Sequence, residues 1–117
     1  MEQLQPLEFL KQYGISLYDD YNIDDYVLNI YHASQFLEIA ENNQIPIIGG
    51  EVYSKSNNGL IIGEYYYLAW SCECNPGENI GYKSYFERSL KMANENLNKI
   101  KEVSLRTHTT LYVNYTF

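Results

Sequence analysis

Hydrophobic residues recur at helical spacing in two long stretches of the chain. In residues 25–43 the repeating apolar positions are Tyr26, Ile30, Ala33, Leu37 and Ala40. In residues 82–103 they are Tyr82, Phe86, Leu90, Ala93, Leu97 and Ile100. Steps of three and four place such residues on one face of a helix, so the sequence predicts two amphipathic helices. Residues 7–13, which lie between Pro6 and Gly14, predict a shorter helix before them.

Three other segments have the composition and alternation of β-strands. Residues 45–53 (IPIIGGEVY) are apolar and β-branched, and the Gly49-Gly50 pair predicts a bulge, a bend or a close backbone approach. Residues 54–59 predict a turn. Residues 60–73 predict a strand bent near Gly63, with Tyr66, Leu68, Trp70 and Cys72 on one face. A loop over residues 74–81 follows, and the alternation in residues 109–117 predicts a last strand.

These elements predict an α+β fold in the order α-α-β-β-α-β, as a single domain over residues 1–117. The economical architecture is a small antiparallel sheet of about three strands packed by two or three helices. No apolar run reaches the length of a membrane helix, and the N-terminal residues do not resemble a signal peptide, so we expect a cytoplasmic protein that does not bind membranes. Cys72 and Cys74 are then expected to be reduced thiols.

Charge is distributed unevenly along the chain. Residues 1–51 hold nine acids and one base, whereas residues 52–117 hold six acids and seven bases. The acidic half argues against a nucleic-acid partner and favours a basic protein partner, although a net charge of −7 also serves solubility. The 13 tyrosines add to this picture, because tyrosine is common on binding surfaces.

The sequence contains no catalytic constellation and no metal-ligand or cofactor motif. His32 and His108 lack obvious partners, and the Asp19-Asp20 and Asp24-Asp25 pairs do not have the spacing of a calcium loop. The Gly49-Gly50 pair is not followed by a predicted helix, so it does not predict a phosphate site. We therefore expect no enzyme activity, no metal and no cofactor.

Residues 36–53 (FLEIAENNQIPIIGGEVY) resemble the immunity protein 40 family of bacterial polymorphic toxin systems. Gly49, Gly50, Val52 and Tyr53 match its motif, and Trp70 lies at about the expected distance on the following strand. The resemblance covers roughly residues 27–117. Glu51 departs from it, since the family pattern has Asp there. We assign the motif residues Gly49, Gly50, Glu51, Val52, Tyr53 and Trp70 mainly to the fold.

The resemblance implies a cytoplasmic protein that binds a cognate toxin domain and blocks it. The acidic, tyrosine-containing segment is the candidate binding surface, and its residues are Tyr18, Asp19, Asp20, Tyr21, Asp24 and Asp25. Helix capping and surface charge are the alternative explanation for its acids. Two other functions stay open: a ligand-binding domain or enzyme that uses Glu51, His32 or the tyrosines, and a homo-oligomer that buries its tyrosines.

Overall fold

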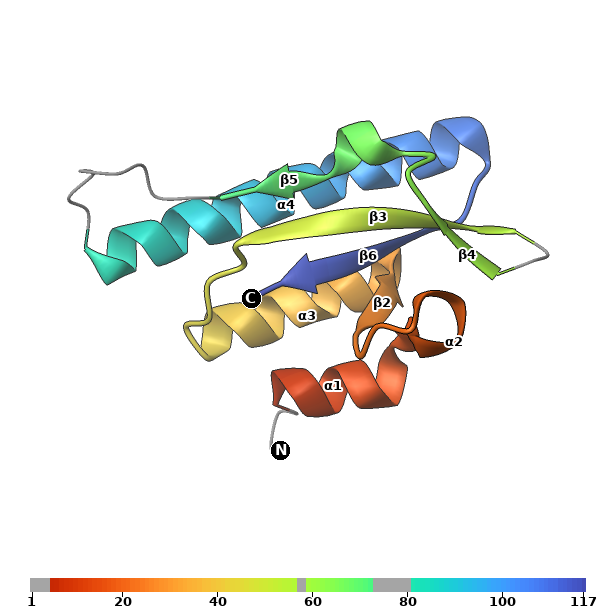
Figure 1. The fold of residues 1–117 in the computed structure, drawn as a ribbon. Helices are drawn as coiled ribbons and strands as arrows, with labels where there is room; N and C mark the ends of the chain where they lie inside the picture. Colours follow the sequence, from red (N-terminus) through yellow and green to blue (C-terminus); the bar gives the residue numbers. More distant parts are fainter. Residues whose placement is uncertain (1–4, 57–58, 73–80) are drawn as a thin grey trace.

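Short strands separate the helices in the computed structural model, which describes residues 5–56, 59–72 and 81–117 (Figure 1). In chain order the elements are α1 (Pro6–Tyr13), β1 (Ile15–Ser16), α2 (Tyr18–Tyr21), β2 (Tyr26–Asn29), α3 (Ile30–Asn42), β3 (Gly49–Ser56), β4 (Gly59–Ile62), the 3-10 helix η1 (Tyr66–Leu68), β5 (Trp70–Ser71), α4 (Tyr82–Thr107) and β6 (Leu111–Thr116). Residues 57–58 of the predicted turn and 74–80 of the predicted loop lie outside the described residues.

All strands of the described chain belong to one antiparallel sheet with the order β1-β2-β6-β3-β4, and β5 also pairs with β3. The predicted α+β class is confirmed. The expected three strands and the order α-α-β-β-α-β were wrong, because the structure has six strands and four α-helices in these residues. Strands β1 and β2 were missed, and β5 was not separated from the longer strand predicted over residues 60–73. All three are two to four residues long, too short for alternation to distinguish them.

The predicted helix over residues 25–43 is divided into a strand and a helix. Tyr26–Asn29 form β2, which pairs with β6, and α3 begins only at Ile30. The helix cap is Asn29, whose side-chain oxygen accepts a hydrogen bond from the backbone N–H of His32 at 2.8 Å. Asp25 therefore does not cap α3. Tyr26 suits helical spacing and strand composition equally, and the pairing of β2 with β1 and β6 places it in the strand.

The predicted strand over residues 60–73 is also divided, into β4, η1 and β5. Gly63 has a φ of +97°, a conformation that favours glycine, and there the chain leaves the edge of β3. It returns seven residues later, when Trp70 pairs with Gly50. Tyr66 and Leu68 thus lie in a 3-10 turn and do not share a strand face with Trp70. Two short strands, β4 and β5, occupy one edge of β3, while β6 occupies the other.

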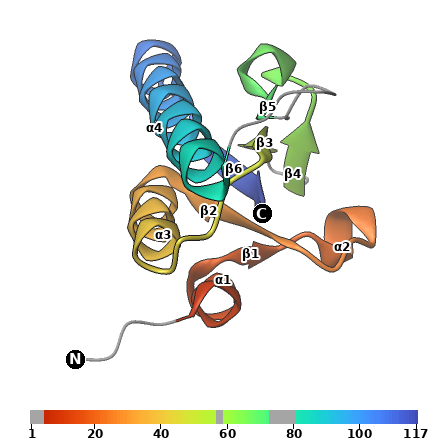
Figure 2. The ribbon, with the colours of Figure 1, turned by 90° about the vertical axis from the view of Figure 1, so that its left-hand side faces the viewer.

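Helices α1, α3 and α4 cover one face of the sheet (Figure 2). The main core lies between them and contains Phe36, Leu97, Ile100, Leu111 and Val113, all fully or almost fully buried. Helix α4 extends four residues beyond the predicted end and stops at Thr107, where His108 adopts a left-handed conformation. No helix in the described chain is long and apolar enough to cross a membrane.

A smaller apolar cluster lies on the opposite face of the sheet. Its buried members are Leu17, Val27, Tyr53 and Leu60, and Tyr21 and Tyr112 pack against it. Leu17 and Tyr21 bring the short helix α2 onto this face (Figure 2). Side chains alternate along β3, so Gly49, Glu51 and Tyr53 share this face while Gly50 and Val52 face the helices. One face of β3 therefore packs on the main core, and the other carries the smaller cluster and the exposed Glu51.

Candidate functional site

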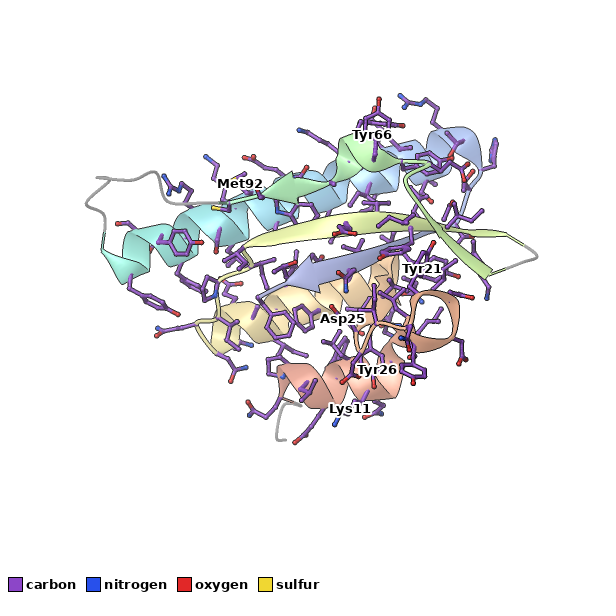
Figure 3. All side chains as sticks on the ribbon, in the orientation of Figure 1. Lys11, Tyr21, Asp25, Tyr26, Tyr66 and Met92 are labelled. Atoms are coloured by element: carbon purple, nitrogen blue, oxygen red, sulfur yellow. The ribbon has the colours of Figure 1, made fainter. Side chains whose placement is uncertain are left out.

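Two residues of the acidic segment hold α2 against the edge strand β4. The hydroxyl of Tyr21 donates a hydrogen bond to the carbonyl of Leu60 and accepts one from the N–H of Ile62, both at 2.9 Å. The carboxylate of Asp20 accepts a third from the N–H of Leu60 at 3.1 Å. Figure 3 shows Tyr21 next to β4. These side chains occupy backbone groups that an edge strand would otherwise expose.

The other four residues of the segment make no hydrogen bond to β4 among the described contacts. Tyr18 is 61% exposed, and Asp19 and Asp24 are exposed as well. Asp25 is half-buried, and its carboxylate accepts a hydrogen bond from the N–H of Tyr26 at 2.8 Å. Tyr18, Asp19 and Asp24 are thus the members of the predicted surface that are open to a partner, whereas Asp20 and Tyr21 bind the chain itself.

Negative charges from two distant parts of the sequence influence the hydroxyl of Tyr53. Burial raises the pKa of Tyr53 to about 12, and the nearby charges of Glu51, Tyr21 and Asp25 add to the effect. Glu51 on β3 and the acidic segment lie on the same side of the sheet as Tyr53, because side chains alternate along β3 and α2 packs on the cluster that contains Tyr53. We define the acidic face as Asp19, Asp24, Asp25 and Glu51.

An open hollow of about 520 Å³ adjoins Glu51 where β3 begins. The described residues that line it are Ile48, Gly49, Gly50, Glu51, Trp70, Ser71, Cys72, Tyr85 and Thr116. Glu51 is the charged residue among them. Gly49 pairs with Ser71 on one side and with Thr116 on the other, so two hydroxyl side chains flank a position without a side chain. Ser71, Thr116 and Glu51 are all exposed.

The Gly-Gly-x-Val-Tyr segment lies along the first half of β3, and its members have different surroundings. Val52 is buried in the main core and Tyr53 in the smaller cluster. A Cβ at position 50 would overlap the six-membered ring of Trp70, and a Cβ at position 49 would lie 2.8 Å from the carbonyl oxygen of Trp70. Both glycines thus allow β5 to pack closely on β3.

Basic side chains concentrate away from the acidic face. Six of the eight bases of the chain lie on α4, which also carries three acids: the bases are Lys83, Arg88, Lys91, Lys99, Lys101 and Arg106. Helix α4 covers the opposite face of the sheet from α2 (Figure 2). The molecule is therefore polarised, with its carboxylate-rich segment and its basic helix on different sides.

His32 lies apart from the other residues proposed for a ligand pocket. His32 lies on α3, where its ring stacks on Tyr13 with centroids 4.7 Å apart and also contacts Phe9 and Tyr31. It does not line the described part of the hollow, whereas Glu51 and one of the tyrosines, Tyr85, do. Among the described residues, no group of three His, Cys, Asp or Glu side chains is placed to hold a metal ion. Cys72 is buried, and Cys74 lies outside them.

Two features of the structure were not predicted from the sequence. Ser71 and Thr116 are brought to Glu51 only by strand pairing between distant segments, and no local signal identifies them. Tyr66 and Tyr67 are 75% and 57% exposed on η1, with ring centroids 6.0 Å apart. Tyr66 lies at the opposite end of the molecule from Lys11 (Figure 3). The tyrosine run was a possible signal, but it was assigned to strand faces.

Comparison with known proteins identifies the family of this chain. The family model described as immunity protein 40 matches residues 9–116, which include every helix and strand from α1 to β6 in whole or in part. No curated protein and no solved structure matches the chain. The match covers nearly the whole sequence, including the Gly-Gly-x-Val-Tyr segment on β3 and Trp70 on β5. The chain belongs to the immunity protein 40 family.

Proposed function

We propose that this protein neutralises a cognate toxin of a bacterial polymorphic toxin system by binding it stoichiometrically in the cytoplasm. The family membership over residues 9–116 is the observation that carries the proposal. Inhibition by binding requires a complementary surface and no reacting groups, which agrees with the sequence. On this proposal the protein is an inhibitor and has no enzymatic activity of its own.

The acidic face is the surface that we assign to the toxin. Asp19 and Asp24 are exposed, and the half-buried Asp25 lies with Glu51 around Tyr53 on the same side of the sheet. Exposed carboxylates attract a basic partner and speed its association, because opposite potentials steer diffusional encounter. Tyr18, which is 61% exposed beside Asp19, supplies an aromatic contact of the kind that is frequent at binding hot spots.

Expression with the neighbouring toxin gene tests the proposal. The toxin domain encoded beside this gene is expressed in bacterial cells with and without this chain, and the two proteins are then co-purified through a tag on the toxin. We expect growth to be rescued and a complex with a fixed ratio of the two proteins to be recovered. Growth arrest in the presence of well-expressed chain, together with the absence of a complex, would overturn the proposal.

A further inference from the structure

The hollow at the start of β3 combines one carboxylate and two hydroxyls around a glycine. Ser71 and Thr116 lie across from Gly49 in the two flanking strands. Glu51 is the next residue of β3 on the same face, roughly 7 Å further along the strand. Three exposed acceptor groups therefore surround Gly49, where the absence of a side chain leaves the hollow open.

The chemistry of this lining matches a guanidinium group. An arginine side chain has five N–H donors in a plane, and it binds a carboxylate through two parallel hydrogen bonds while other acceptors take the remaining donors. An ammonium group is a compact point charge and lacks the planar fork of donors that lets guanidinium bond to several separate acceptors at once.

The space and charge of the hollow agree with an incoming protein segment. A volume of about 520 Å³ exceeds the size of a single side chain and accepts an arginine together with part of the loop that carries it. Glu51 belongs to the acidic face, so a basic partner steered to Asp19 and Asp24 meets a carboxylate here as well. We propose that this hollow receives an arginine side chain of the toxin, whose guanidinium binds Glu51, Ser71 and Thr116.

This inference rests on the proposed function, and binding measurements with the cognate toxin domain test the two separately. Calorimetry gives the Kd of the toxin for the wild-type chain, for Glu51→Gln and for Glu51→Asp. We expect Glu51→Gln to raise the Kd about 10- to 100-fold, because it removes the charge of a hydrogen-bonded ion pair. Glu51→Asp keeps the charge and should retain most of the affinity. Glu38→Gln, an exposed position on α3, is the matched control and should leave the Kd unchanged.

A second variant fills the hollow without altering its charge. Thr116→Tyr introduces a large side chain at an exposed position of β6 that tolerates aromatic residues. We expect it to raise the Kd at least tenfold while the urea midpoint stays near that of the wild type. Thr110→Tyr, at an exposed position before the strand, should bind like the wild type.

Replacement of each toxin arginine by alanine identifies the bound residue. In double-mutant cycles against Glu51→Gln, one arginine should show a loss of affinity that is not additive with the loss at Glu51. If the wild-type chain binds toxin but Glu51→Gln and Thr116→Tyr bind equally well, the hollow is not the site and the proposed function stands. If the wild-type chain neither binds nor protects, both proposals are wrong.

Discussion

The six-membered ring of the Trp70 indole lies against Gly50, in the space that a side chain at position 50 would occupy. The two residues face each other across the β3–β5 pairing. The same indole meets Tyr115 of β6 edge-to-face, with ring centroids 5.9 Å apart. Gly50 thus lets one aromatic ring join three strands, which explains how the two-residue strand β5 is held to the sheet.

Substitution of Gly50 by alanine should therefore destabilise the fold. Its Cβ would overlap two ring carbons and lie 3.0 Å from a third, the Cζ2 atom, so the indole must move out of its contact with Tyr115. We expect a loss of about 1–3 kcal/mol in the free energy of unfolding, the usual cost of overpacking. Urea denaturation followed by the fluorescence of Trp70, the single tryptophan, measures it.

Gly81→Ala is the matched control for Gly50→Ala. An added Cβ at position 81 meets no heavy atom of the described structure within 4 Å, and the backbone there has an ordinary negative φ. Its effect should stay within about 1 kcal/mol. Equal effects of the two substitutions would contradict the assigned contact with Trp70.

Removal of the Tyr21 hydroxyl should loosen the outer edge of β4. Tyr21→Phe leaves the carbonyl of Leu60 and the N–H of Ile62 to solvent, so we expect a loss of about 1 kcal/mol of stability. Amide exchange should accelerate at Ile62, whose N–H binds that hydroxyl. Tyr18→Phe, an exposed tyrosine on the same helix, is the control and should change neither quantity. Unaltered exchange at Ile62 in Tyr21→Phe would contradict the role of the Tyr21 hydroxyl in holding β4.

Tyr53 makes stability sensitive to alkaline pH. Its folded-state pKa of about 12 lies above the ordinary value of 10.0, so the unfolded chain loses this proton first. The stability that Tyr53 contributes through its raised pKa is therefore complete below pH 10 and is lost as pH rises towards 12. We expect a fall of about 1–2 kcal/mol, after allowance for screening of the neighbouring carboxylates.

Tyr53→Phe isolates the contribution of Tyr53 to this loss of stability. The control is needed because burial also raises the pKa of Tyr115, which adds its own loss of stability at alkaline pH. Unfolding free energies at pH 9, 10, 11 and 12 should decline less steeply in Tyr53→Phe than in the wild type. Glu51→Gln should lower the pKa of Tyr53, as followed by tyrosinate absorbance, because it removes one of the nearby negative charges. Parallel stability curves for wild type and Tyr53→Phe would refute the assignment.

Charge reversal on the acidic face should slow association with the toxin. Asp19→Lys combined with Asp24→Lys alters two exposed carboxylates that hold no described backbone group, so folding should be preserved. We expect the association rate constant to fall about tenfold at low salt, and the difference to shrink as salt is added. Glu38→Lys combined with Glu41→Lys on α3 is the control. Stopped-flow mixing over a salt series measures both, and identical rates would remove Asp19 and Asp24 from the interface.

The sequence predicted long elements well and short ones poorly. Helices α1 and α4 and strand β6 were recognised because their periodicity extends over six or more residues. Strand β2 was merged with α3, since Tyr26 continues the helical spacing and only the pairing of β2 with β1 and β6 distinguishes the strand from the helix. The tyrosines of η1 alternate like a strand, and the detour at Gly63 follows from pairing partners elsewhere.

The candidate site was predictable to a similar extent. Local composition identified the acidic segment, and the exposure of Asp19 and Asp24 agrees with a surface role. Local composition gave no indication that Asp20 and Tyr21 bind the backbone of β4, because those contacts join residues about 40 positions apart. The neighbourhood of Glu51 with Asp25 around Tyr53 likewise depends on the assembled sheet.

The central position of β6 has a consequence for the order of events during synthesis. This strand lies between β2 and β3, which have no described pairing with each other, so it alone joins the two parts of the sheet. While the ribosome still holds residues 111–116, the strand pairing that joins β2 to β3 is absent, and only other contacts, such as those between α2 and β4, can connect the segments that carry Asp25 and Glu51. The continuous sheet beneath the acidic face is therefore completed only after β6 has left the ribosome.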